Sequence, residues 1–252
     1  MNQHFNLTRF GQLFRKHTTE QLTSYLMATA VLLGGMVLVL GFMTYIHGSP
    51  LDKQVRGILC MMFLLAAGSF FTSTAFVQFG TGLQAATVLT LPASHLEKYM
   101  VAWVYSLPIF LLVFAGTFYT ADWLVMQLST LRGQAQPLVD LFSPLALRTV
   151  LLYLIVHGVA LWGSIFFPKQ QFIKTAFGGL TATAVLLIVN YHVVAGMLGT
   201  ELRLAYPFGN VGLRSGSVLS LPDNQPQWLL LPLVLAGLLW VAAYARLTEK
   251  QI

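Results

Sequence analysis

Six stretches of the chain are mostly apolar and contain no Lys, Arg, Asp or Glu. They cover residues 24–46, 57–79, 99–121, 149–167, 175–200 and 227–245. A helix needs about 20 such residues to cross the hydrocarbon core of a bilayer. A soluble protein of 252 residues would need more charged side chains than the 9% found here, and its helices would carry a polar face. The sequence therefore predicts an all-α integral membrane protein, with residues 1–252 forming one domain of six transmembrane helices.

The first of these stretches reads as a retained span. It is too long for the apolar region of a cleavable signal peptide, and no small-residue cleavage site clearly closes it.

The basic residues suggest how the spans are oriented. Six spans put both termini on one side, and that side carries eight of the 14 Lys and Arg residues, against six on the other. Counting acids as well, the net charges are +5 and +1. Because cytoplasmic loops are enriched in Lys and Arg, we expect both termini in the cytoplasm. This asymmetry also accounts for the net charge of +6, and no basic patch interleaved with aromatics predicts a nucleic-acid partner.

Residues 5–17 precede the first span and have an amphipathic pattern. Phe5, Phe10, Leu13 and Phe14 recur at helical spacing, and basic residues take the other faces. This pattern predicts an interfacial helix whose aromatic side chains enter the acyl region of the bilayer. A frayed polar leader is the alternative.

The stretch LTLPASHLEKYMVAWVY, residues 89–105, interrupts the apolar chain with a proline, a serine and an acid–base pair. Ser94 and Glu97 have the spacing of a capping box, so Ser94 is expected to begin the third span, and Pro92 to end what precedes it. A turn of about four residues would connect two adjacent spans, yet residues 80–97 are far longer. The additional residues, including a possible short helix over 83–91, suggest a partner.

Two other features concern the backbone. Pro108 predicts a kink in the third span. Residues 201–226 form a long, partly apolar external segment with several Gly and Pro residues. They are expected to form either re-entrant half-helices or an ordinary exposed loop.

Few residues suggest chemistry. There is no phosphate-binding glycine loop, no H-E-x-x-H motif and only one cysteine, so we expect no catalytic, cofactor-binding or metal-binding residues on this chain. His157 and His192 lie within spans and are either haem ligands, a proton relay or neutral partners in helix–helix hydrogen bonds. Asn190, Tyr191 and His192 either line a substrate path or bond to a facing helix.

This organisation resembles the permease subunit of ABC-2 type ABC transporters. The stretch at 89–105 is similar to the L-P-x-S-x-x-E-K…W signature of small permeases of this family, particularly those of Bacteroidetes-like bacteria. The resemblance in organisation covers nearly the whole chain, and the motif covers some fifteen residues.

The resemblance implies a bacterial inner-membrane exporter. Two such subunits, identical or different, would form the path, and two separate ATPase subunits would bind ATP and Mg on the cytoplasmic side. The loop at 80–97 would supply a coupling helix that docks on the ATPase, and the family's external half-helices would fall within 201–226. Carried onto this chain, the coupling residues are Leu83, Gln84, Thr87, Val88, Leu89, Leu91, Glu97 and Lys98.

Two alternatives come from other functional classes. One is a haem-binding membrane redox subunit that uses His157 and His192. The other is a membrane scaffold that keeps a permease-like fold without transport.

Overall fold

The computed structural model describes residues 5–74, 94–130, 137–167, 170–199, 202–205, 211–214, 218–219 and 227–249. Within this part of the chain, six helical segments are long and apolar enough to cross a membrane, in agreement with the six predicted spans. The helices are α1 (Leu7–His47), α2 (Lys53–Thr74), α4 (His95–Val104), the π-helix η2 (Tyr105–Ile109), α5 (Phe110–Thr130), α6 (Pro144–Phe166), α7 (Gln171–Leu198) and α8 (Gln227–Glu249). The third span comprises α4, η2 and α5, which follow one another without interruption.

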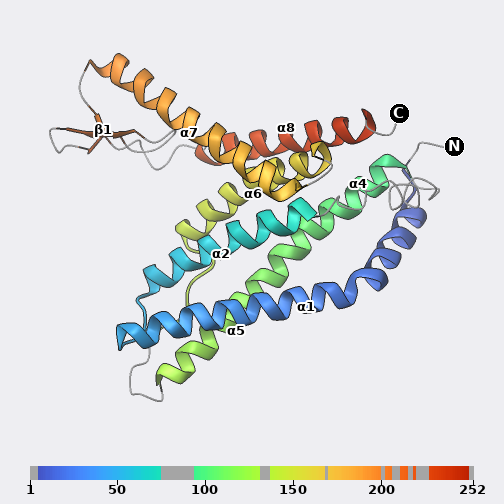
Figure 1. Cartoon of the computed structure of the whole chain (residues 1–252), viewed down its shortest axis with the longest axis horizontal. Helices are drawn as coiled ribbons and strands as arrows, with labels where there is room; N and C mark the ends of the chain where they lie inside the picture. Colours follow the sequence, from blue (N-terminus) through green and yellow to red (C-terminus); the bar gives the residue numbers. More distant parts are fainter. Residues whose placement is uncertain are drawn as a thin grey trace.

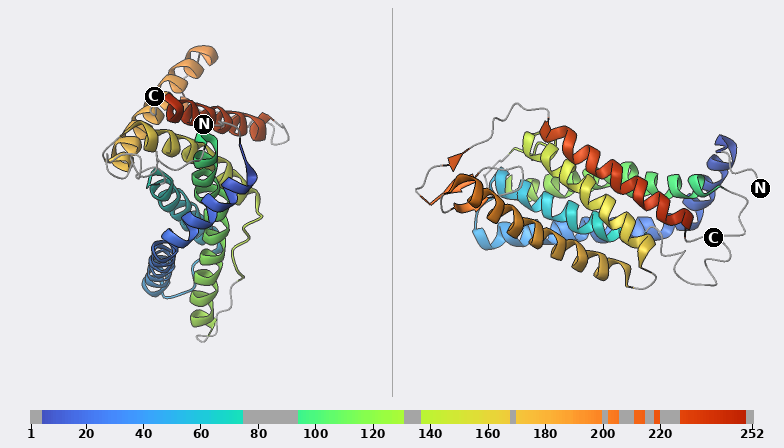
Figure 2. Two further views of the ribbon diagram at one scale, coloured as in Figure 1. Left: turned by 90° about the vertical axis from the view of Figure 1, so that its right-hand side faces the viewer. Right: turned by 90° about the horizontal axis from the view of Figure 1, so that it is seen from above.

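The spans run along the long axis of the molecule in alternating directions (Figure 1). Both chain termini lie at one end, here called the terminal end, and the strands lie at the other, here called the sheet end (Figures 1 and 2). This arrangement follows from an even number of spans. The chain is a multi-pass membrane protein, as its composition predicts.

Helix α1 differs from the prediction of a separate interfacial helix followed by a span. It is one continuous helix of 41 residues, which begins after the N-cap Asn6 and ends at Gly48 in a left-handed conformation. The Asn6 side chain accepts a hydrogen bond from the Thr8 amide at 2.9 Å. The first turns bend away from the rest of the helix (Figure 1). The amphipathic residues 5–17 therefore lead directly into the first span, because no residue between them and Ser24 breaks the helix.

The third span contains the irregularity that Pro108 predicts. Residues Tyr105–Ile109 form a π-helical turn with Pro108 inside it. Proline has no amide hydrogen to donate and its ring crowds the preceding turn, so a wider turn accommodates it. The span also continues to Thr130, nine residues past its apolar stretch, and places Asp122 inside the helix.

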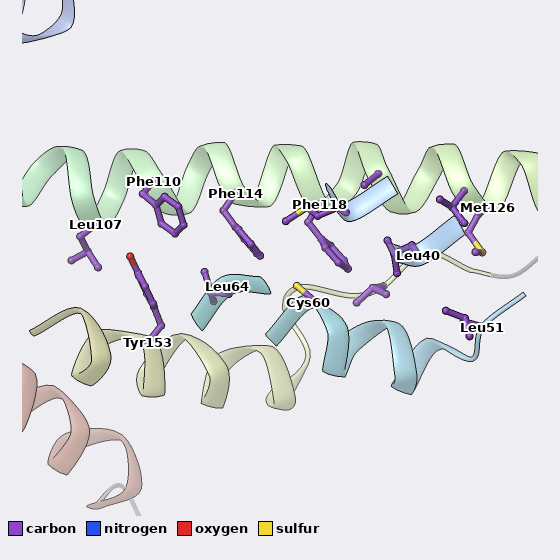
Figure 3. Packing of buried hydrophobic residues seen from close by; sticks show 14 residues of the cluster. Leu40, Leu51, Cys60, Leu64, Leu107, Phe110, Phe114, Phe118, Met126 and Tyr153 are labelled. Carbon is purple, nitrogen blue, oxygen red and sulfur yellow. The ribbon is translucent and has the colours of Figure 1, made fainter. Parts of the chain in front are cut away.

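Helix α6 is the central element of one half of the bundle. Three glycines allow close helix crossings: Gly68 of α2 lies against Tyr153 of α6, Gly158 of α6 against Leu239 of α8, and Gly163 of α6 against Thr175 of α7. Small residues at crossings let membrane helices approach closely. Aromatic and aliphatic side chains from α1, α2, α5 and α6 form the larger apolar core, as Figure 3 shows.

The described residues of the segment between α7 and α8 form strands, where re-entrant half-helices or an exposed loop were considered above. Among the described residues of 201–226, β1 (Leu202–Ala205), β2 (Val211–Leu213) and β3 (Val218–Leu219) pair antiparallel in the order β1-β2-β3. Backbone pairing between neighbouring strands satisfies polar groups that a single extended segment would leave open.

Candidate functional site

The predicted capping box is present at the start of α4. Ser94 Oγ accepts a hydrogen bond from the Glu97 amide at 3.2 Å, and Glu97 Oε2 accepts one from the Ser94 amide at 2.8 Å. The box satisfies two amides that the first turn of a helix leaves without intrahelical partners. The prediction that Ser94 begins the third span is confirmed.

Glu97 also holds the beginning of α1. Its second oxygen, Oε1, accepts a hydrogen bond from the backbone amide of Asn6 at 2.8 Å and lies 3.3 Å from Arg9 Nη2. The Glu97 side chain is fully buried, and that of Arg9 is 32% exposed. One carboxylate therefore joins the first turns of two helices that are 91 residues apart in sequence. These four residues, Asn6, Arg9, Ser94 and Glu97, are called the Glu97 clamp below.

An aromatic cluster continues the contact between α1 and the third span. The Tyr105 ring lies 4.9 Å from the Phe14 ring, 4.6 Å from the His17 ring and 5.5 Å from the Tyr25 ring, measured between ring centres. The Tyr105 and Thr18 hydroxyls are hydrogen-bonded, and His17 Nε2 lies 2.7 Å from the Tyr25 hydroxyl. Aromatic pairs at such distances contribute stability beyond their buried area.

This packing adds a protein contact to the predicted amphipathic face. Phe10, Leu13 and Phe14 are half-buried against protein, whereas only Phe5 of the four predicted side chains is exposed. Phe14 of this face packs against the Tyr105 ring of the third span. Entry of the aromatic face into the acyl region stays a prediction.

The predicted coupling residues fall into two groups. Glu97 and Lys98 are both buried at the start of α4. Leu83, Gln84, Thr87, Val88, Leu89 and Leu91 lie outside the described residues.

His157 lies in a polar cluster at the middle of the bundle. Its Nδ1 accepts a hydrogen bond from the Trp240 indole at 3.0 Å, so Nε2 carries the proton and donates to Ser106 Oγ at 2.9 Å. The Tyr153 hydroxyl donates to the Ser106 carbonyl, inside the π-helical turn, at 3.0 Å. The imidazole is neutral with both nitrogens occupied, which favours helix–helix bonding over haem ligation. In the described part of the chain no group of three His, Cys, Asp or Glu residues is arranged to hold a metal ion.

The polar residues of α7 contact the three-stranded sheet. The side-chain amide of Asn190 donates a hydrogen bond to the Ala205 carbonyl, and the Tyr191 hydroxyl donates one to the Leu202 carbonyl, both at 3.2 Å. Both partners belong to β1. His192 is exposed, and its ring packs edge-on against that of Tyr191. Two of the three residues thus hold the strand β1 against α7.

A buried ion pair closes the sheet end of the bundle. Arg56 Nη1 of α2 lies 2.6 Å from Asp122 Oδ1 of α5, and neither side chain is exposed. Arg56 also donates to the carbonyls of Leu51 and Pro137, at 3.1 and 2.6 Å, and Asp122 Oδ2 accepts from the Val139 amide at 3.0 Å. A buried ion pair is retained at low cost only when such additional bonds satisfy it.

Sequence reasoning missed the ion pair and the Asn6 and Arg9 side of the clamp. Arg56 and Asp122 each lie one residue outside an apolar stretch, where they read as ordinary charges that end a span. Asn6 precedes an apolar periodic segment and had the signal of an N-cap, but a capping signal does not predict a tertiary contact.

Comparison of the chain with models of protein families, with curated proteins and with solved structures gives no significant match.

Proposed function

We propose that this chain is the membrane-spanning permease subunit of an ATP-driven exporter of the ABC-2 type. The observation that carries the proposal is the Glu97 clamp. It joins α1 and the third span at the terminal end, and its residues Ser94 and Glu97 form the end of the segment at 80–97 that the resemblance assigns to ATPase docking.

The clamp offers a mechanical route from that segment into the membrane. A force applied before Ser94 reaches the capped first turn of α4, and through Glu97 it also reaches the first turn of α1. A helix is stiff along its axis, so α4 transmits the displacement to η2. The π-helical turn at Pro108 is the point at which the span is expected to bend, since π-helical turns and prolines interrupt the regular backbone bonding.

The third span is anchored at the sheet end. Arg56 and Asp122 tie α5 to α2 with a pair that has no exposed side chain. Movement driven at the terminal end would therefore alter the bundle between the clamp and the ion pair.

Burial changes the role we assign to Glu97. A fully buried carboxylate with intrachain partners has no oxygen facing an ATPase, so Glu97 acts as the link between two helices. Docking itself then rests on Leu83, Gln84, Thr87, Val88, Leu89 and Leu91.

The remaining parts of the proposal follow the same family pattern. The partners are two ATPase subunits, which carry ATP and Mg, and a second permease subunit, in a bacterial inner membrane with both termini of this chain in the cytoplasm. No catalysis takes place on this chain. Asn190, Tyr191 and His192 stay as predicted path-lining residues, and the first two also support β1.

The test is purification of the tagged protein from its native membranes in mild detergent. The co-purifying proteins are identified by mass spectrometry and assayed for ATP hydrolysis. Leu83→Arg and Leu89→Arg are the test variants, and Leu219→Arg is the matched control, because Leu219 is exposed on β3 at the opposite end.

We expect an ATPase with the wild type and with Leu219→Arg, and its loss with either loop variant. Absence of any ATPase from a folded preparation would overturn the proposal. A partner that binds without any nucleotide-dependent change in conformation would favour the alternative of a membrane scaffold that does not transport.

A further inference from the structure

An apolar cavity of about 270 Å³ lies near the sheet end, between α2, α5 and the start of α6. Cys60 and Leu64 of α2, Leu111 and Phe114 of α5, and Val150 of α6 line it. Figure 3 shows Leu64 and Phe114 pointing toward each other from the two helices. The four clamp residues, Arg56 and Asp122 do not line this space, whereas Val139, whose amide donates to Asp122, does.

The cavity is elongated along the spans. Its lining on α2 runs from Gly57 to Leu64 and its lining on α5 from Leu111 to Tyr119. At a rise of about 1.5 Å per helical residue, each wall is roughly 10 to 12 Å long. The long direction is therefore parallel to the helices, which is also the direction of hydrocarbon chains in a bilayer.

The two ends of the cavity differ in polarity. The end toward the middle of the bundle is lined by aliphatic and aromatic side chains. The other end is lined by Tyr119 of α5 and, in the segment that connects α5 to α6, by the polar residues Asp140 and Ser143 beside the apolar Val139, Leu141 and Phe142. Asp140 is exposed, and one of its oxygens accepts a hydrogen bond from the Phe142 amide at 2.9 Å. Among the residues that line the cavity, Asp140 is the one with a charged side chain, and it lies at this end.

The geometry points to a binding site for an amphiphile with an ammonium head group, drawn from the outer leaflet of the bilayer. Its alkyl chain lies in the cavity between α2 and α5, and its head lies beside the Asp140 carboxylate. Small-molecule sites are commonly of this kind, mostly apolar with a few convergent polar groups. The site does not depend on an ATPase, so it stands or falls separately from the proposed transport function.

The test uses dodecylamine carrying a diazirine on its alkyl chain as the probe, with the matching dodecyl sulfate as the comparison. The full chain is placed in phosphatidylcholine nanodiscs, irradiated with each probe and mapped by peptide mass spectrometry. With the amine probe we expect label concentrated on peptides covering 57–64 and 111–119. Label spread evenly over lipid-facing helices such as α7 would overturn the proposal.

Two adjacent positions on α5 provide a matched pair of variants. Ala115 lines the cavity, whereas a Cβ atom added at Gly116 would meet nothing within 4 Å. Ala115→Phe is expected to remove most of the cavity label, and Gly116→Phe to leave it unchanged. Gly57→Leu fills the cavity from α2 and serves if Ala115→Phe does not fold.

The charge at the opening is tested with Asp140→Asn. An exposed ion pair contributes up to about 1 kcal/mol, so the preference for amine over sulfate should fall roughly fivefold. If the ratio of amine label to sulfate label is the same in wild type and Asp140→Asn, the ammonium assignment is overturned. Label on the cavity peptides of the monomer that disappears in a dimeric preparation would overturn the proposal in favour of a second copy of this chain.

Discussion

The third span carries a buried acid near each end, and the two are held differently. Asp122 lies beside an arginine that is itself fully buried and has three acceptors within 3.1 Å. Glu97 is held mainly by two backbone amides at 2.8 Å, and its arginine is partly exposed at 3.3 Å. A charge closed off on all sides fixes helices together, whereas one with a partner open to water can exchange that partner. The third span is therefore held rigidly at the sheet end and adjustably at the terminal end.

The largest effect is expected from Asp122→Leu. The substitution leaves the Arg56 guanidinium buried without its counter-charge, and breaking a buried pair in this way costs about 3 to 5 kcal/mol of the free energy of unfolding. Unfolding in detergent micelles measures the loss. The double variant Arg56→Leu/Asp122→Leu should recover only part of it, because the Leu51 and Pro137 carbonyls and the Val139 amide lose their partners.

Glu97→Ala is expected to cost less, about 2 kcal/mol, because it removes charge-assisted bonds to two amides but leaves no fully buried cation. Amide hydrogen exchange should accelerate over the first turns of both α1 and α4. Faster exchange confined to α4 would show that Glu97 caps its own helix and does not hold α1.

A smaller effect is expected midway between the two acids. Trp240→Phe removes the indole N–H that His157 accepts, and single polar bonds between membrane helices average about 0.6 kcal/mol. The free energy of unfolding should fall by an amount of that size. His157→Phe, which also frees Ser106, should cost more than Trp240→Phe, and the reverse order would contradict the assigned hydrogen bonds.

The smallest effect is expected from Arg9→Ala. Its pair with Glu97 is partly exposed to solvent, so the loss in the free energy of unfolding should be about 0.5 kcal/mol and should shrink with added salt. A loss as large as that of Asp122→Leu would abolish the distinction between the two ends.

Local signals predicted much of the fold. The apolar stretches marked six spans, the S-x-x-E spacing marked the start of α4, and Pro108 marked the irregular turn, because each depends on neighbouring residues alone. The Arg56–Asp122 pair joins residues 66 apart, and the spacing of a single charge does not reveal its partner. Strands β1 to β3 were missed because runs of two to four residues are too short for periodicity to separate them from a loop.

The candidate site was predicted less completely. The capping pair Ser94 and Glu97 was predicted, but its extension to Asn6 and Arg9 was not, since it depends on the position of α1. The same contact turned the aromatic face of α1 toward Tyr105, where sequence periodicity alone indicated only an apolar face.

The central claim is that ATP moves the terminal end of the third span while the sheet end stays fixed. The direct measurement is the distance between two spin labels in the purified complex with the proposed ATPase, after Cys60→Ala removes the single cysteine. One label pair replaces Arg15 and Leu96 at the terminal end, and a second replaces Gln54 and Leu124 at the sheet end. The account predicts that ATP with vanadate changes the Arg15–Leu96 distance and leaves the Gln54–Leu124 distance unaltered. An unchanged Arg15–Leu96 distance, or a larger change at the sheet end, would contradict it.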